Sequence, residues 1–126
     1  ELTINDQLYL LESQIIHSLA EKGPCVIIGR CADYVLREHK HTLNVFVHAD
    51  IEFRKKRAVE HYGISPKKIE DFLHKQDKHR AHYHSFYTDQ KWKAIENYDL
   101  TIDSSRFGID ASVEMIIAAA KIKSGI

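Results

Sequence analysis

The chain has 126 residues, which is enough for one domain with one hydrophobic core. Lysine plus arginine and aspartate plus glutamate number 18 each, so the positive excess that marks most nucleic-acid binders is missing. No apolar run has the length of a membrane span, and no signal-peptide pattern is seen. Because the two cysteines form no C-x-x-C pair, we expect two free thiols and a cytoplasmic protein. From the charge balance and the lack of a long apolar run, we expect neither a nucleic-acid nor a membrane partner. Nothing in the sequence indicates the oligomeric state.

Helix and strand signals alternate in the first half of the chain. Apolar residues at helical spacing predict a helix over residues 5–22 that buries one face and stops at Gly23–Pro24. The apolar run CVIIG, residues 25–29, predicts a strand buried on both faces, as in parallel sheets. A short helix over residues 32–38 and a second strand over residues 43–49 follow.

The second half continues the alternation. Asp50 is placed to cap a helix that runs through Tyr62, and Ser65–Pro66 has the residues of a helix cap and first turn. The remaining predicted segments are an irregular connection over 88–98, a third strand over 99–103 and an amphipathic helix over 109–122. Strands that alternate with helices predict a single α/β domain, in which helices cover both faces of a parallel sheet.

The stretch HKQDKHRAHYHSFY, residues 74–87, concentrates positive charge. On a helix, one broad face would hold His74, Lys75, Lys78, His79 and His82. One hypothesis is a mobile helix whose cations close over phosphate groups. The simplest alternative is a solvated helix whose aromatic side chains pack inward.

Two further alternatives for this stretch have less support. His79 and His82, three residues apart, have a spacing that zinc ligands use, but the second ligand pair is missing, and we expect no metal site. Tyr83, Phe86 and Tyr87 alternate with basic residues and would suit base stacking. The neutral net charge argues against a nucleic-acid surface.

The carboxyl ends of the predicted strands are where an open parallel sheet binds ligands. Arg30 follows Gly29 at the end of the first predicted strand, where an arginine suits either a phosphate contact or an ion pair with an acid. Arg54 and Arg57 share one helical face, and for Arg54 an ion pair with Asp50 is as good an interpretation as a functional role. No G-x-x-x-x-G-K-[ST] phosphate loop occurs in the sequence.

Three segments resemble one protein family. They are GPCVIIGRCADYVL (23–36), VFVHADIEFRKKRAVEHYGI (45–64) and DKHRAHYHSFYTDQKWKAIENYDLTIDSSRFGID (77–110). In this order they are similar to the cytidylate kinase-like family, relatives of bacterial cytidylate kinase among the P-loop nucleoside monophosphate kinases. The resemblance covers about residues 5–122. It implies a parallel five-stranded sheet with a lid, here about residues 65–90, and transfer of the ATP γ-phosphoryl group to a nucleoside monophosphate with Mg²⁺.

The resemblance also implies roles for single residues. Arg30 matches an arginine that binds the monophosphate. Cys31 stands where the classical enzymes have an aspartate that contacts cytosine, so a preference for cytosine does not carry over. In the lid, Lys75, Lys78 and Arg80 would bind phosphates, with Arg30, Lys78 and Arg80 as the catalytic cations.

Three more residues take roles from the resemblance. Asp77 of the lid would hold the ribose of the substrate. Arg57, on the helix before the lid, would lie near ATP, and Arg106 would lie in a loop near the adenine.

One part of the family pattern has no counterpart in the sequence. The pattern begins with a strand, a glycine-rich phosphate loop and a helix, ahead of the helix predicted at residue 5. We therefore expect residues 1–126 to form the carboxy-terminal part of such a kinase, incomplete at the N-terminus and inactive alone. The alternative is a non-catalytic module of the same fold that binds nucleotides or other anions.

Overall fold

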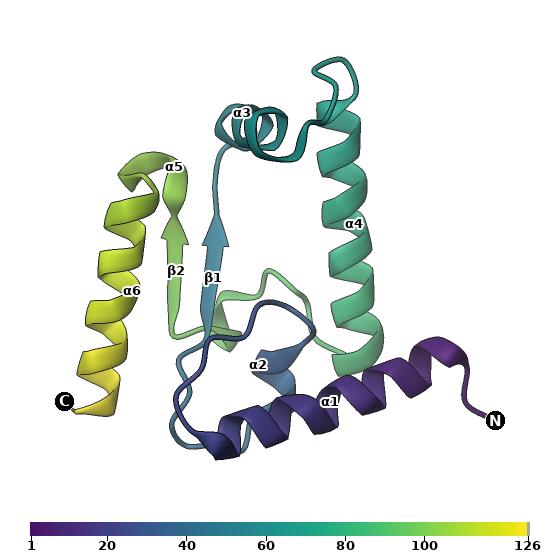
Figure 1. The fold of residues 1–126 in the computed structure, drawn as a ribbon, viewed down its shortest axis with the longest axis vertical. Helices are drawn as coiled ribbons and strands as arrows, with labels where there is room; N and C mark the ends of the chain where they lie inside the picture. Colours follow the sequence, from purple (N-terminus) through teal and green to yellow (C-terminus); the bar gives the residue numbers. More distant parts are fainter. Residues whose placement is uncertain (126) are drawn as a thin grey trace.

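The computed structural model describes residues 1–125 and shows a small sheet flanked by helices (Figure 1). The helices are α1 (Ile4–Lys22), α2 (Ala32–Val35), α3 (Ile51–Tyr62), α4 (Ile69–Thr88), α5 (Ser104–Phe107) and α6 (Ile109–Ser124), with a 3₁₀ turn at Ile95–Asn97. The strands are β1 (Val45–His48) and β2 (Leu100–Asp103). No helix in this part of the chain combines the length and apolar character needed to cross a bilayer.

The sheet consists of β1 and β2, which pair in parallel with His48 opposite Asp103. This confirms the predicted α/β class and the predicted strands at 43–49 and 99–103. Both strands end toward the same edge, where β1 leads into α3 and β2 into α5 (Figure 1). α6 lies along β2, and α4 stands on the other side of β1 (Figure 1).

The prediction of a buried strand at residues 25–29 is wrong for the described structure. Residues 24–28 have no regular secondary structure and pair with neither β1 nor β2. Val26 is 91% exposed and Ile28 87% exposed. An apolar, β-branched sequence favours extended backbone, but a strand also needs a neighbour to receive its hydrogen bonds.

Helix α1 forms as predicted but buries less of its apolar face than expected. Thr3 caps the helix and forms a reciprocal capping box with Asp6. Of the predicted apolar face only Ile16 is buried, at 5% exposed. The others are 41–53% exposed: Leu8, Leu11, Ile15 and Leu19. The remaining face of α1 therefore has no packing partner within residues 1–125.

The helices α3 and α4 pack against each other at the carboxyl end of β1. Asp50 caps α3 through a 2.8 Å bond from the Phe53 N–H, and Gly63 ends α3 in the left-handed conformation, as predicted. The predicted cap at Ser65 is wrong, because α4 begins at Ile69 with Lys68 at its N-cap. The carbonyl of Ser65 accepts the Lys68 N–H in a turn that precedes the helix.

The buried apolar residues form two separate small clusters. The first comprises Ile16 of α1 with Ala32, Val35 and Leu36 around α2. The second comprises Ala58 of α3 with Ile69 and Leu73 of α4. The total accessible surface is 9603 Å², whereas a compact monomer of this mass exposes about 6,900 Å². The described chain is therefore an open arrangement that leaves much apolar surface in solvent.

Candidate functional site

A carboxylate shared by two arginines forms the centre of the candidate site. Asp77 of α4 accepts two hydrogen bonds from Arg54 of α3, at 2.8 and 2.7 Å. A second guanidinium, that of Arg80, bonds the same carboxylate at 2.6 Å. The side chains of Arg54 and Asp77 are 25% and 19% exposed, so this ion pair is mostly screened from water. Two cations around one anion leave an excess of positive charge at this place.

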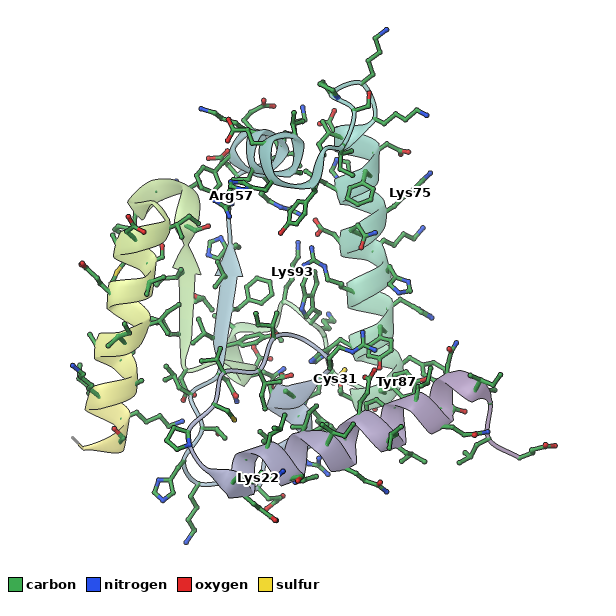
Figure 2. The ribbon with its side chains drawn as sticks, in the orientation of Figure 1. Lys22, Cys31, Arg57, Lys75, Tyr87 and Lys93 are labelled. Carbon is green, nitrogen blue, oxygen red and sulfur yellow. The ribbon has the colours of Figure 1, made fainter. Side chains whose placement is uncertain are left out.

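An aromatic layer supports Arg80 from the sheet side. The Arg80 guanidinium carbon lies 4.9 Å from the centroid of the Trp92 ring. Trp92 packs edge-on against Phe46 of β1, with 5.3 Å between ring centroids. The loop that follows α4 thus fills the space between α4 and β1, and Figure 2 shows Lys93 of the same loop in that space. This layer fixes the guanidinium plane of Arg80.

The two arginines keep Asp77 ionised. Burial alone would raise the pKa of the Asp77 carboxyl, but the hydrogen bonds and charges of Arg54 and Arg80 outweigh it. The net result is that the pKa of Asp77 lies below its ordinary value of 3.8. The carboxylate therefore stays charged near neutral pH and holds both guanidinium groups in place.

A tight turn carries the second group of candidate residues. Gly29, Arg30 and Cys31 have successive positive φ angles of 68°, 56° and 59°. Positive φ is unfavourable for residues with a β-carbon, so the backbone at Arg30 and Cys31 is strained. The Ala32 N–H closes the turn by bonding to the Gly29 carbonyl at 3.1 Å.

Arg30 is paired rather than free. Its Nε and Nη2 bond both carboxylate oxygens of Glu12 on α1, at 2.9 and 2.8 Å. The hydrogen bond to Glu12 is the main reason that the pKa of Arg30 rises. The guanidinium carbon lies 5.1 Å from the ring centroid of Tyr83, which follows Arg80 by one helical turn on α4. Arg30 thus contacts α4 at Tyr83, one helical turn after Arg80.

Cys31 lies beneath the surface of the turn. The residue is 4% exposed, and burial together with the nearby Asp33 carboxylate raises the pKa of its thiol to about 11. Figure 2 shows Cys31 near the junction of α1 and α4. A buried, protonated thiol offers no surface to a base in this conformation. The predicted substrate contact of Cys31 stays a prediction.

The two lid lysines take no part in the described ion pairs of Asp77, which are with Arg54 and Arg80. Lys75 and Lys78 line a shallow surface groove with His79 and His82, and these are four of the five residues of the predicted common face. Figure 2 shows Lys75 pointing away from the rest of the molecule, and its Nζ pairs with Asp71 at 3.1 Å. The structure therefore brings Asp77 and Arg80 together with Arg54 and leaves the lysines outside the group.

The predicted ATP-side residues lie at the carboxyl edge of the sheet. Arg57 lies on α3 above the strand ends (Figure 2), and no ion pair of Arg57 occurs within residues 1–125. Arg106 is on α5, where its Nε bonds Asp103 at 3.2 Å while 81% of the side chain is exposed. The hydroxyl and N–H of Ser105 are the leading reason that the pKa of Asp103 lies below its ordinary value. Arg106 and Arg57 belong to neither the Asp77 group nor the Arg30 turn.

Comparison with known proteins identifies the family. A family model described as the cytidylate kinase-like family matches residues 1–106. The chain belongs to the cytidylate kinase-like family. This confirms the resemblance drawn from the sequence and supports a function related to nucleotide kinases.

One solved structure shares the fold of this family member over nearly the whole length of residues 1–126. It is the crystal structure of an uncharacterized protein from Eubacterium ventriosum ATCC 27560, with a TM-score of 0.87 and 29% sequence identity. The match covers 95% of this chain and 68% of that chain. No curated protein matches the sequence.

The family implies the use of ATP and a metal in general, and neither a phosphate loop nor a three-ligand metal group occurs among the described residues. The 126 residues hold no G-x-x-x-x-G-K-[ST] loop, and GPCVIIGR (23–30) forms a helix end, a segment without regular secondary structure and a turn. Within residues 1–125 no three His, Cys, Asp or Glu side chains are placed to hold a metal ion. The chemistry that these residues do fit is the binding of a phosphate group by arginines.

Sequence reasoning missed three members of the site. Arg54 pairs with Asp77 and not with Asp50, whose side chain is used to cap α3. Glu12 and Trp92 hold Arg30 and Arg80, although both come from other elements. The one available signal was the occurrence of Arg54 and Arg57 on one helical face. That spacing does not indicate which carboxylate either arginine pairs with.

Proposed function

We propose that this family member is a nucleotide kinase that transfers the γ-phosphoryl group of ATP, with Mg²⁺, to a nucleoside monophosphate. We further propose that Arg54, Arg80 and Arg30 bind the phosphate of the acceptor. The observation that carries this proposal is the carboxylate of Asp77, which holds two guanidinium groups side by side in a partly buried position. Phosphoryl transfer asks mainly for positioning and charge neutralisation, which such a cluster supplies.

The guanidinium groups keep free donors for a phosphate. Each arginine has five N–H donors in a planar fork. Arg80 uses Nη2 for Asp77, so its Nε and Nη1 are available to phosphate oxygens. Arg54 bonds Asp77 through Nη1 and Nη2 and keeps its Nε–H free of that pair. Because Asp77 cancels one of the two positive charges, one net charge remains to attract a phosphate dianion.

Asp77 also retains capacity for a sugar hydroxyl. A carboxylate offers about four acceptor positions. The guanidinium groups of Arg54 and Arg80 use three of them, two on Oδ1 and one on Oδ2. We infer that the remaining position on Oδ2 accepts a ribose hydroxyl, which would place the sugar beside the phosphate that the arginines hold.

The identity of the base is left open by the residues around the turn. A buried, protonated Cys31 supplies no charged contact to cytosine, so we propose a nucleoside monophosphate as the acceptor class without assigning its base. The G-x-x-x-x-G-K-[ST] pattern does not occur in the 126 residues, so no step through ATP or Mg²⁺ is assigned to any side chain.

The test is phosphoryl transfer by the full-length protein. A panel of nucleoside and deoxynucleoside monophosphates is incubated with Mg²⁺ and ATP, and ADP formation is followed with nucleoside diphosphate formation. We expect one or more acceptors to be phosphorylated, and Arg80→Ala to reduce kcat/KM by about a hundredfold or more. Lys121→Ala, at an exposed position on α6, is the control and should retain activity.

The same panel decides between a kinase and a binding module. A binding module would quench the fluorescence of Trp92 with a monophosphate, because Arg80 contacts that ring, yet form no diphosphate product. Transfer to none of the acceptors by the full-length protein would therefore refute the kinase proposal.

A further inference from the structure

A buried histidine joins the base of α4 to the turn that carries Arg30. His84 of α4 is 5% exposed. Its Nε2 lies 3.3 and 3.4 Å from the two carboxylate oxygens of Asp33 on α2. Its Nδ1 lies 3.2 Å from the Thr88 hydroxyl oxygen and 3.4 Å from the Gln90 carbonyl. None of these residues belongs to the phosphate cluster around Asp77.

The partners of His84 are all acceptors. The Thr88 hydroxyl donates its one proton to the carbonyl of His84, at 2.7 Å, and its oxygen receives the Gln90 N–H at 3.1 Å. A carbonyl and a carboxylate have no proton to give. Both ring nitrogens of His84 therefore face acceptors, and a proton on either nitrogen has a partner. Asp33 is the charged group that faces the ring, whereas Thr88 and Gln90 are neutral.

The His84–Asp33 pair spans the two halves of the candidate site. His84 follows Arg80 by four residues on α4, so the two side chains lie one helical turn apart. Asp33 follows Arg30 by three residues, directly after the turn of successive positive φ angles. A strained turn keeps its conformation only where its surroundings hold it. The pair is a buried polar contact between that turn and the helix that bears Arg80.

We propose that His84 is a positioning residue, which fixes the base of α4 against the Gly29–Cys31 turn and so sets the spacing of Arg80 and Arg30 across the acceptor phosphate. This inference rests on the proposed function, because it concerns the binding of the same acceptor. His84 itself is not proposed to contact the phosphate. Its effect passes through Asp33 to the turn and through α4 to Arg80.

Steady-state kinetics of the full-length protein tests the inference. With ATP saturating and the acceptor varied, we expect His84→Ala to raise the acceptor KM by about ten- to a hundredfold with a smaller change in kcat, because misplaced arginines bind the acceptor less well. His84→Gln restores one donor toward Asp33 and should recover part of the loss. Combining His84→Ala with Asp33→Asn should add little to either single change.

Control measurements separate positioning from folding. His82→Ala removes a histidine from the exposed face of the same helix and should leave the acceptor KM unchanged. If His84→Ala fails to fold, His84→Gln and Asp33→Asn carry the kinetic test. An unchanged acceptor KM in the folded His84 and Asp33 variants would overturn the inference.

A second readout needs no catalysis. Nitrogen NMR of the His84 ring in the full-length protein, at one fixed pH, should show ring-nitrogen chemical shifts that differ between Asp33→Asn and the unchanged protein, because Nε2 lies against the Asp33 carboxylate. Unchanged shifts would overturn the pairing. If the unchanged protein transfers no phosphoryl group, the proposed function fails, while the NMR result still decides whether His84 and Asp33 are coupled.

Discussion

Arg54 of α3 and Asp77 of α4 stand 23 residues apart in the sequence and are joined by two parallel hydrogen bonds of 2.8 and 2.7 Å. This bidentate geometry gives a guanidinium–carboxylate pair both strength and a fixed orientation. Because Arg80 bonds the same carboxylate, one acidic side chain sets the place of two cations from two helices.

Removing the shared carboxylate should destabilise the protein and change how stability depends on pH. We expect Asp77→Asn to lower the free energy of unfolding near neutral pH by about 2 kcal/mol, since two guanidinium groups lose a charged acceptor. The folded-state pKa of Asp77 is lowered, so its contribution is present above the ordinary value of 3.8 and is lost as pH falls through the lowered pKa. Urea unfolding at a series of pH values measures this.

Comparing the unchanged protein with Asp77→Asn separates the contribution of Asp77 to stability from the contributions of other carboxylates. The stability difference between the unchanged protein and Asp77→Asn should be full at neutral pH and should shrink as the pH falls below 3.8. A difference that stays constant through this range would contradict the assignment. Lys75→Asn, an exposed change on α4, should alter stability by less than about 0.5 kcal/mol.

Substitutions at Arg80 and Arg57 should differ in their effect on the acceptor. Arg80→Ala should raise the KM for the acceptor, whereas Arg57→Ala should leave the acceptor KM near its original value. The reason is that Arg80 belongs to the Asp77 cluster and Arg57 lies at the carboxyl edge of the sheet. Kinetics with the acceptor varied at saturating ATP checks this, and an equal rise of the acceptor KM in both variants would contradict the separation.

The two cysteines should differ in reactivity. Cys25 is exposed, whereas Cys31 is buried with a thiol whose pKa is raised to about 11. Since the thiolate is the reactive form, iodoacetamide near neutral pH should label Cys25 in the folded protein and both cysteines in urea. Mass spectrometry of tryptic peptides reads the sites. Equal labelling of Cys31 in the folded protein would show that the turn opens.

The strained turn should respond to a β-carbon at its first position. Gly29 has a φ of 68°, and a β-carbon built there meets no atom within 4 Å. The cost of Gly29→Ala is therefore backbone strain alone, about 1 kcal/mol of unfolding free energy. Chemical denaturation measures it, with Ser18→Ala on the exposed surface of α1 as the control. A stability gain in Gly29→Ala would contradict the left-handed conformation.

The paired strands and most helices could be predicted because their signals are local. The strands at 43–49 and 99–103 are short apolar runs between polar residues, and the cap at Asp50 and stop at Gly63 each act within one helical turn. Residues 25–29 carry an equally strong strand signal, yet form no ladder in the described chain. A ladder depends on a second segment distant in sequence, and no local pattern supplies that information.

The candidate site was predictable only in part, for the same reason. Helical spacing predicted a common face for Lys75, Lys78, His79 and His82, and these four residues line one surface groove. The resemblance to the family nevertheless assigned these lysines a phosphate role, which stays a prediction. The pairing of Arg54 with Asp77 depends on how α3 packs against α4, and the spacing of residues along either helix does not encode it.

The two hydrophobic clusters share no residue, which has a consequence for cooperativity. The first cluster supports the turn that bears Arg30, and the second supports the helix that bears Arg54. An acceptor held by both arginines would link two packing units that are otherwise joined mainly along α4. Its binding free energy would then add to the stability of both units at once, and their unfolding would merge into a single transition.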